Sequence, residues 1–189
     1  MERDLKKYTT VDGQLFKLLV EASLNWLQTN QQIVNSLNVF PVPDGDTGTN
    51  MLLTLQAAYN EIRDSGDKKI SKIAHAVAQG ALMGARGNSG VILSQLWRGF
   101  SRSLDNKDTM NMVDFSKALI EAKNTAYKGV VRPVEGTILT VAKDISIASE
   151  EIIKETNDLE TFLEKIVQAA DISVQNTPEL LPILKQAGV

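Results

Sequence analysis

The chain has 189 residues, 43% hydrophobic and 23% charged, so it is long and apolar enough to bury one core of ordinary size. Its 20 basic and 23 acidic residues give a formal net charge of −3, which, without any basic run, argues against nucleic-acid binding. The absence of cysteine excludes disulfides and thiolate metal sites. Because the start Met1–Lys7 is charged and no run of about 18 apolar residues occurs, we expect a cytoplasmic protein without stable membrane insertion.

Apolar residues recur at three- and four-residue steps through most of the chain, which is the spacing of amphipathic helices. In the first such segment, from an N-cap at Asp12 to about residue 37, the stripe includes Phe16 and Trp26. Later segments cover 51–66, 70–84, 91–100, 113–129, 136–155 and 158–175, and Thr177 with Pro178 opens an eighth helix. No segment alternates with the period of a strand. The sequence therefore predicts one all-α domain over 1–189, built from about eight antiparallel helices.

The stretch 38–51 between the first two helical segments places two carboxylates, Asp44 and Asp46, on a short loop. Pro41 and Pro43 stiffen this loop, and its glycines permit a sharp turn. Paired carboxylates are typical ligands of Mg²⁺, which completes its shell with phosphate and water oxygens. A polar turn before a helix has the same composition, so that interpretation stays open. An EF-hand is excluded, because the spacing puts Thr49 where that loop needs glycine.

Two further glycine-bearing segments precede helices. In Gly84–Gly90, free backbone N–H groups could bind phosphate, with Ser89 and Arg86 adding polar contacts. An ordinary interhelix turn with a glycine C-cap is the alternative. The segment 132–137 ends in a Gly–Thr pair that could equally be a helix cap. If the three segments converge at one end of the bundle, they form a Mg²⁺–nucleotide site, although spacing alone does not establish the convergence.

Three long stretches closely resemble a known family: Leu37–Met51, Leu82–Gln95 and Pro133–Asp144. They are similar to the N-terminal kinase domain of bacterial fatty acid kinases, which belongs to the dihydroxyacetone kinase nucleotide-binding (DhaL-like) family. The resemblance covers nearly the whole chain. It implies an antiparallel eight-helix barrel that holds ATP or ADP and two Mg²⁺ ions at its open end.

The resemblance also implies roles for individual residues. Asp44 and Asp46 correspond to Mg²⁺ ligands that act in catalysis, and Asn38 lies near the place of a further metal-binding Asp, where it would be a weaker, neutral ligand. The implied nucleotide contacts are Thr47, Thr49, Asn50, Arg86, Asn88, Ser89, Gly90, Gly136, Thr137 and Leu139. Thr47 stands where dihydroxyacetone kinases have a histidine, which argues against dihydroxyacetone as the substrate.

In the resembled family the chain continues beyond the position of Val189, so we expect this sequence to be the N-terminal part of a longer polypeptide. The implied activity is transfer of the γ-phosphoryl group of ATP to a fatty acid carboxylate presented by a separate fatty-acid-binding protein of the DegV-like type. A fatty carboxylate is ionised at pH 7 and needs no general base, which suits a loop without one. A small-molecule kinase subunit and a non-catalytic nucleotide sensor are the alternatives, and a homodimer is compatible with the sequence.

Overall fold

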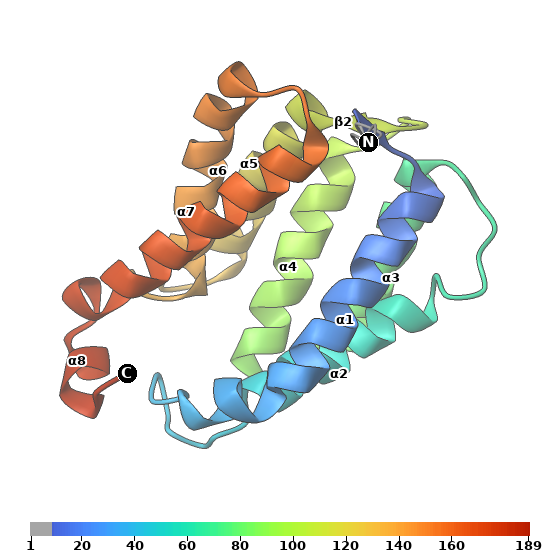
Figure 1. Cartoon of the computed structure of the whole chain (residues 1–189). Coiled ribbons are helices and arrows are strands. Elements are labelled where there is room, and N and C mark those ends of the chain that lie inside the picture. Colours follow the sequence, from blue (N-terminus) through green and yellow to red (C-terminus); the bar gives the residue numbers. More distant parts are fainter. Residues whose placement is uncertain (1–8) are drawn as a thin grey trace, which may run out of the picture.

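The computed structural model describes residues 9–189, and the charged start Met1–Lys7 lies outside this range. The described part of the chain forms eight helices and one two-stranded ladder, which confirms the predicted all-α fold (Figure 1). The elements are β1 (Thr10–Val11), α1 (Gly13–Ser36), α2 (Thr47–Asn60), α3 (Ile70–Met83), α4 (Gly87–Ser103), β2 (Met110–Asn111), α5 (Met112–Gly129), α6 (Ile138–Glu155), α7 (Leu159–Leu180) and α8 (Pro182–Ala187). No helix among residues 9–189 is long and apolar enough to cross a membrane.

Each helix packs against the next one along the chain, and α1 also packs on α3, as α2 does on α4. Because the links are short, consecutive helices run in opposite directions (Figure 1). The C-terminal ends of α1, α3, α5 and α7 therefore meet the N-terminal ends of α2, α4 and α6 at one end of the bundle. All three segments singled out in the sequence lie at this end, which we call the loop end.

A row of phenylalanine rings connects the two halves of the bundle. Phe16 of α1 stacks on Phe100 of α4 with ring centroids 5.8 Å apart, and Phe100 meets Phe115 of α5 edge-on at 5.4 Å. Phe115 in turn lies 5.4 Å from Phe162 of α7, which is fully buried. Such pairs add about 0.5–1.5 kcal/mol each to the burial of their surface. The predicted stripe of α1 was wrong at Trp26, which is 74% exposed.

Some helix boundaries follow local signals, but the end of α2 and the predicted start of the eighth helix do not. Helix α2 ends at Asn60, six residues before Gly66, where the sequence predicted its end. Asp12 caps α1 by accepting from the Leu15 N–H at 2.8 Å, and Gly84 ends α3, both as predicted. The helix expected to open at Thr177 does not begin there, because α7 runs on through Pro178 to Leu180. Pro178 cannot donate to the carbonyl of Val174, and the Thr177 hydroxyl donates to that carbonyl instead at 2.7 Å. The helix therefore tolerates a proline that we interpreted as a helix start.

The short ladder was not predicted, because two residues per strand leave no periodic signal. Thr10 pairs with Asn111 and Val11 with Met110 in antiparallel register. Val11 and Met110 are both fully buried. The ladder joins the start of α1 to the start of α5 at the end of the bundle opposite the loop end.

Candidate functional site

The acidic loop joins α1 to α2 and presents its two carboxylates differently. Asp44 is exposed, while Asp46 is half-buried at the N-cap of α2 and makes no side-chain capping bond. Gly45, between them, has φ +68°, a conformation that favours glycine. Residues 9–189 contain no cluster of three or more His, Asp or Glu side chains. A hard cation held here would therefore take most of its ligands from phosphate and water, which is the usual manner of Mg²⁺, so the two carboxylates fit that ion.

Asn38 closes the same loop through both edges of its side-chain amide. Its Nδ2 donates to the carbonyl of Val42 at 2.8 Å. Its Oδ1 accepts from the backbone N–H groups of Asp46 and Thr47 at 3.3 and 3.2 Å, and from the Thr47 hydroxyl at 2.7 Å. These three donors occupy the oxygen that we expected to ligate a metal.

Thr49, an expected nucleotide contact, faces α1. Its hydroxyl accepts from Gln31 Nε2 at 2.8 Å and from Asn35 Nδ2 at 3.0 Å, and its N–H donates to Asn35 Oδ1 at 3.1 Å. A Cβ on neighbouring Gly48 would lie 2.4 Å from the Gln31 carbonyl, and φ of Gly48 is not positive. The side chain of Thr49 and the absence of one at Gly48 thus contribute to helix packing, and a nucleotide contact by Thr49 stays a prediction.

The start of α4 lies directly against the start of α2. The Ser89 hydroxyl donates to the Thr47 carbonyl at 3.5 Å, and Gly87, with φ +57°, lies so close to Asn50 that a Cβ there would be 2.4 Å from Asn50 Nδ2. The N-cap residue Arg86 gives this helix no side-chain capping bond. The stretch 38–51 and the segment Gly84–Gly90 therefore lie in contact at the loop end, and the Asn50 side chain packs against Gly87.

The starts of α2 and α4 differ in how many of their backbone N–H groups donate to side chains. Side chains from the end of α1 accept the N–H groups of Asp46, Thr47 and Thr49 at the start of α2. At the start of α4 only the N–H of Arg86 has a side-chain acceptor, Thr54 Oγ1 at 3.2 Å, and the side chains of Arg86 and Asn88 are exposed. Free N–H groups at a helix N-terminus favour anions. The loop end thus places an acidic loop beside an anion-favouring helix start.

The backbone N–H of Gly90 is not among the free N–H groups at the start of α4. Its N–H donates to the Arg86 carbonyl at 2.9 Å, and the residue is buried. A Cβ on Gly90 would lie 2.4 Å from Thr54 Oγ1 of α2. Gly90 thus allows close packing of α4 on α2, and its predicted contact with phosphate stays a prediction.

The third predicted segment lies at the loop end but packs elsewhere. Thr137 caps α6 by accepting from the Leu139 N–H at 3.3 Å. Gly136 has φ +80°, and a Cβ there would lie 2.5 Å from Cβ of Leu181, between α7 and α8. Leu139 is 2% exposed, so its side chain belongs to the interior and does not form an open wall of a site. Nucleotide contacts from Gly136, Thr137 and Leu139 stay predictions.

A polar cluster around Glu135, beside Gly136, was not predicted from the sequence. The Glu135 carboxylate accepts from Tyr127 Oη at 2.9 Å, from Thr140 Oγ1 at 2.7 Å and from Lys143 Nζ at 2.7 Å. The hydrogen bond from Lys143, followed by that from Thr140, lowers the pKa of Glu135 below its ordinary value. Burial and the bond to Glu135 raise the pKa of Tyr127. A single glutamate carries no periodic or motif signal, so only the folded α5–α6 turn identifies this cluster.

We expect Glu135→Gln to lose a pH-dependent part of the stability. Because the pKa of Glu135 is lowered on folding, its contribution is present at neutral pH and disappears as the pH falls through that pKa. The wild type should be more stable than the variant at pH 7 by no more than about 1 kcal/mol, since the Glu135–Lys143 pair is solvent-exposed, and the difference should be smaller at an acidic pH below the ordinary pKa of glutamate. Thermal unfolding at both pH values measures this difference. Glu150→Gln, an exposed change on α6, is the control.

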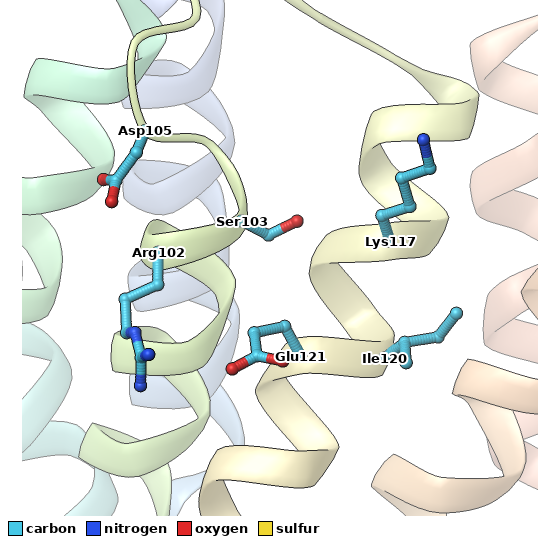
Figure 2. Close-up of a pocket in the computed structure, with 6 residues that line it drawn as sticks. All are labelled: Arg102, Ser103, Asp105, Lys117, Ile120 and Glu121. Atoms are coloured by element: carbon cyan, nitrogen blue, oxygen red, sulfur yellow. The ribbon is translucent and has the colours of Figure 1, made fainter.

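Two hollows in the surface of residues 9–189 lie away from the loop end. One of about 410 Å³ lies between the C-terminal end of α4 and α5, lined by Arg102, Ser103, Asp105, Lys117, Ile120 and Glu121 (Figure 2). Another includes His75 and Lys69 near the start of α3. Both are open and lined mainly by charged or polar side chains. The hollow near α3 also contains two carboxylates, Asp105 and Asp108, and Lys69 pairs with Asp108 at 2.9 Å. We take the loop end as the candidate site because the motifs singled out in the sequence lie there.

Comparison with known proteins identifies the family of the chain. The DAK2 domain family matches residues 41–189, and the chain belongs to that family of DhaL-like, kinase-type nucleotide-binding domains. Protein YloV of Bacillus subtilis is 46% identical over 180 residues, and uncharacterized proteins of Staphylococcus saprophyticus and Staphylococcus aureus are each 45% identical over 179 residues. Each match covers 95% of this chain but only 32–33% of the relative. The chain thus spans about a third of the length of these relatives.

Proposed function

We propose that this chain is the ATP- and Mg²⁺-binding domain of a two-component fatty acid kinase. The activity transfers the γ-phosphoryl group of ATP to the carboxylate of a fatty acid, which a separate fatty-acid-binding protein of the DegV-like type presents, and yields an acyl phosphate and ADP. The observation that carries the proposal is the contact between Thr47 and Ser89, which joins the acidic loop to the open start of α4. Family membership supports nucleotide binding, and the resemblance of the three motifs to fatty acid kinases supports the acceptor.

The residues at the loop end divide the binding of ATP between them. Asp44 and Asp46 hold Mg²⁺, which neutralises charge on the phosphate oxygens. The N–H groups at the start of α4, with Ser89 and the exposed guanidinium of Arg86, hold phosphate oxygens. Charge is therefore balanced from two sides, with the cation on the side of α2 and hydrogen-bond donors on the side of α4.

A carboxylate acceptor agrees with the chemistry of the loop end. The only histidine of the chain, His75, lies exposed in the first half of α3, towards the opposite end of the bundle. A hydroxyl acceptor requires a base to remove its proton, whereas a fatty acid is already ionised at pH 7. The carboxylate oxygen can then form its bond to the γ-phosphorus as the bond to the β-phosphate oxygen breaks, with no proton to remove.

A carrier for the acyl chain agrees with the surface of the domain. The hollows near Arg102 and His75 are lined mainly by polar and charged side chains, which suits an alkyl chain poorly. Each CH₂ left in water forfeits about 0.8 kcal/mol of burial. A partner that buries the chain and exposes the carboxylate removes this cost.

Acyl phosphate formation tests the proposal. The 189-residue chain is incubated with ATP, Mg²⁺ and a long-chain fatty acid, with and without the fatty-acid-binding protein, and acyl phosphate is trapped with hydroxylamine. We expect ATP·Mg²⁺ binding but no product from free fatty acid, and product only when the carrier and a full-length relative are present. Efficient product formation without a carrier would contradict the two-component scheme. Phosphorylation of dihydroxyacetone would favour a small-molecule kinase, and binding without turnover in any mixture would favour a nucleotide sensor.

A further inference from the structure

Three side-chain amides at the end of α1 bind the start of α2. Gln31 and Asn35 lie one turn apart on α1 and bond to Thr49. Asn38 follows the helix and bonds to Asp46 and Thr47. The backbone that carries Asp46 is thereby tied to α1 through side chains of the protein itself.

Asn38 spans the whole acidic loop. Its Nδ2 holds the carbonyl of Val42 near the middle of the loop, while its Oδ1 holds the amides of Asp46 and Thr47 at the loop's end. A carbonyl oxygen has two lone pairs, and three donors already point at this one, including the Thr47 hydroxyl at 2.7 Å. A cation could use Asn38 only after these bonds break.

We propose that Asn38 is a positioning residue, which fixes the loop bearing Asp44 and Asp46 before any metal binds and does not itself ligate Mg²⁺. The proposal rests on the proposed function for the role of the two carboxylates. Its physical basis is preorganisation: a loop already held in place loses less conformational freedom when its carboxylates bind a cation. It assigns Asn38 a different task from the metal ligand implied by the resemblance.

Amide hydrogen exchange in metal-free protein gives the first test. In EDTA, the N–H groups of Asp46 and Thr47 should be protected in the wild type, and Asn38→Ala should lower their protection roughly three- to tenfold. Asn38→Asp should restore it, because a carboxylate oxygen accepts the same three bonds. The matched control is Asn30→Ala, which removes an exposed α1 amide bonded only to the carbonyl of Trp26. Free exchange in the metal-free wild type, followed by protection on adding Mg²⁺ and ADP, would overturn the proposal.

Calorimetric titration with ADP gives a readout that a general structural role would not move. Asn38→Ala should raise the Mg²⁺ concentration needed for half-maximal tightening of ADP binding about tenfold, while ADP affinity in EDTA stays as in the wild type. Equal losses with and without Mg²⁺, or an unchanged Mg²⁺ requirement, would refute a positioning role. If the wild type binds no ADP at all, the proposed function fails, and the exchange experiment still decides whether Asn38 holds the loop.

Discussion

Asp44→Asn and Asp46→Asn should each abolish the Mg²⁺-dependent part of ATP binding while the helical fold persists. Each substitution removes one anionic ligand from a loop that offers a cation two carboxylates. Loss of an outer-shell partner of a bound metal typically costs 10–100-fold in metal affinity, so loss of a direct ligand should cost at least about 100-fold. Calorimetric titration with ATP, in Mg²⁺ and in EDTA, separates the metal-dependent part from the rest.

Asp64→Asn is the matched control for these two variants. Its side chain is 88% exposed and pairs only with the adjacent Arg63, at the opposite end of α2. The control should bind ATP like the wild type, and circular dichroism of all three variants should be unchanged. If both loop variants bind ATP in Mg²⁺ with wild-type affinity, the loop is an ordinary polar turn and not a metal site.

The helical part of the fold was predictable because its determinants are local. Asp12 and Gly84 mark helix ends through their own capping chemistry, and apolar spacing identifies the segments between. Short links also place the acidic loop and the start of α4 at the same end of the bundle, because neighbouring helices run in opposite directions. Only the structure shows that the two are in contact. Spacing could not decide which apolar residues of a helix face the core. Trp26 is an example, because it continues the apolar pattern of α1 and yet is 74% exposed.

The roles of polar residues at the loop end were not predictable, because they depend on partners distant in sequence. Thr49 was assigned to the nucleotide, and the structure bonds it to Gln31 and Asn35, 18 and 14 residues earlier. A motif shows which residue type occupies a position, but that residue type can be required for packing as well as for binding a ligand. Asn38 and Gly90 are ambiguous in the same way, so contacts rather than motifs must separate the two causes.

Gly90→Val should destabilise the fold, and any loss of nucleotide binding should follow from that. The β-carbon of the new side chain would lie 2.4 Å from Thr54 Oγ1, and Thr54 is itself fully buried. The Thr54 hydroxyl also donates to the Asn50 carbonyl at 2.8 Å and accepts from the Arg86 N–H at 3.2 Å, so it cannot move without breaking bonds at both helix starts. Overpacking of this kind costs about 1–3 kcal/mol or more. For a chain of this size, the melting temperature should fall by roughly 4–10 °C.

A double-mutant cycle separates packing from phosphate contact at this position. Thr54→Ala removes the oxygen that a Cβ at residue 90 would strike, and the next atom, the carbonyl oxygen of Asn50, is 3.4 Å away. Gly90→Ala should therefore destabilise the wild type clearly but the Thr54→Ala background much less, with a coupling of about 1 kcal/mol or more. Gly66→Ala, where a Cβ meets nothing within 4 Å, should show no coupling. If the losses of stability from Gly90→Ala and Thr54→Ala are additive, and a fully folded Gly90→Ala protein binds ATP more weakly, Gly90 contacts phosphate.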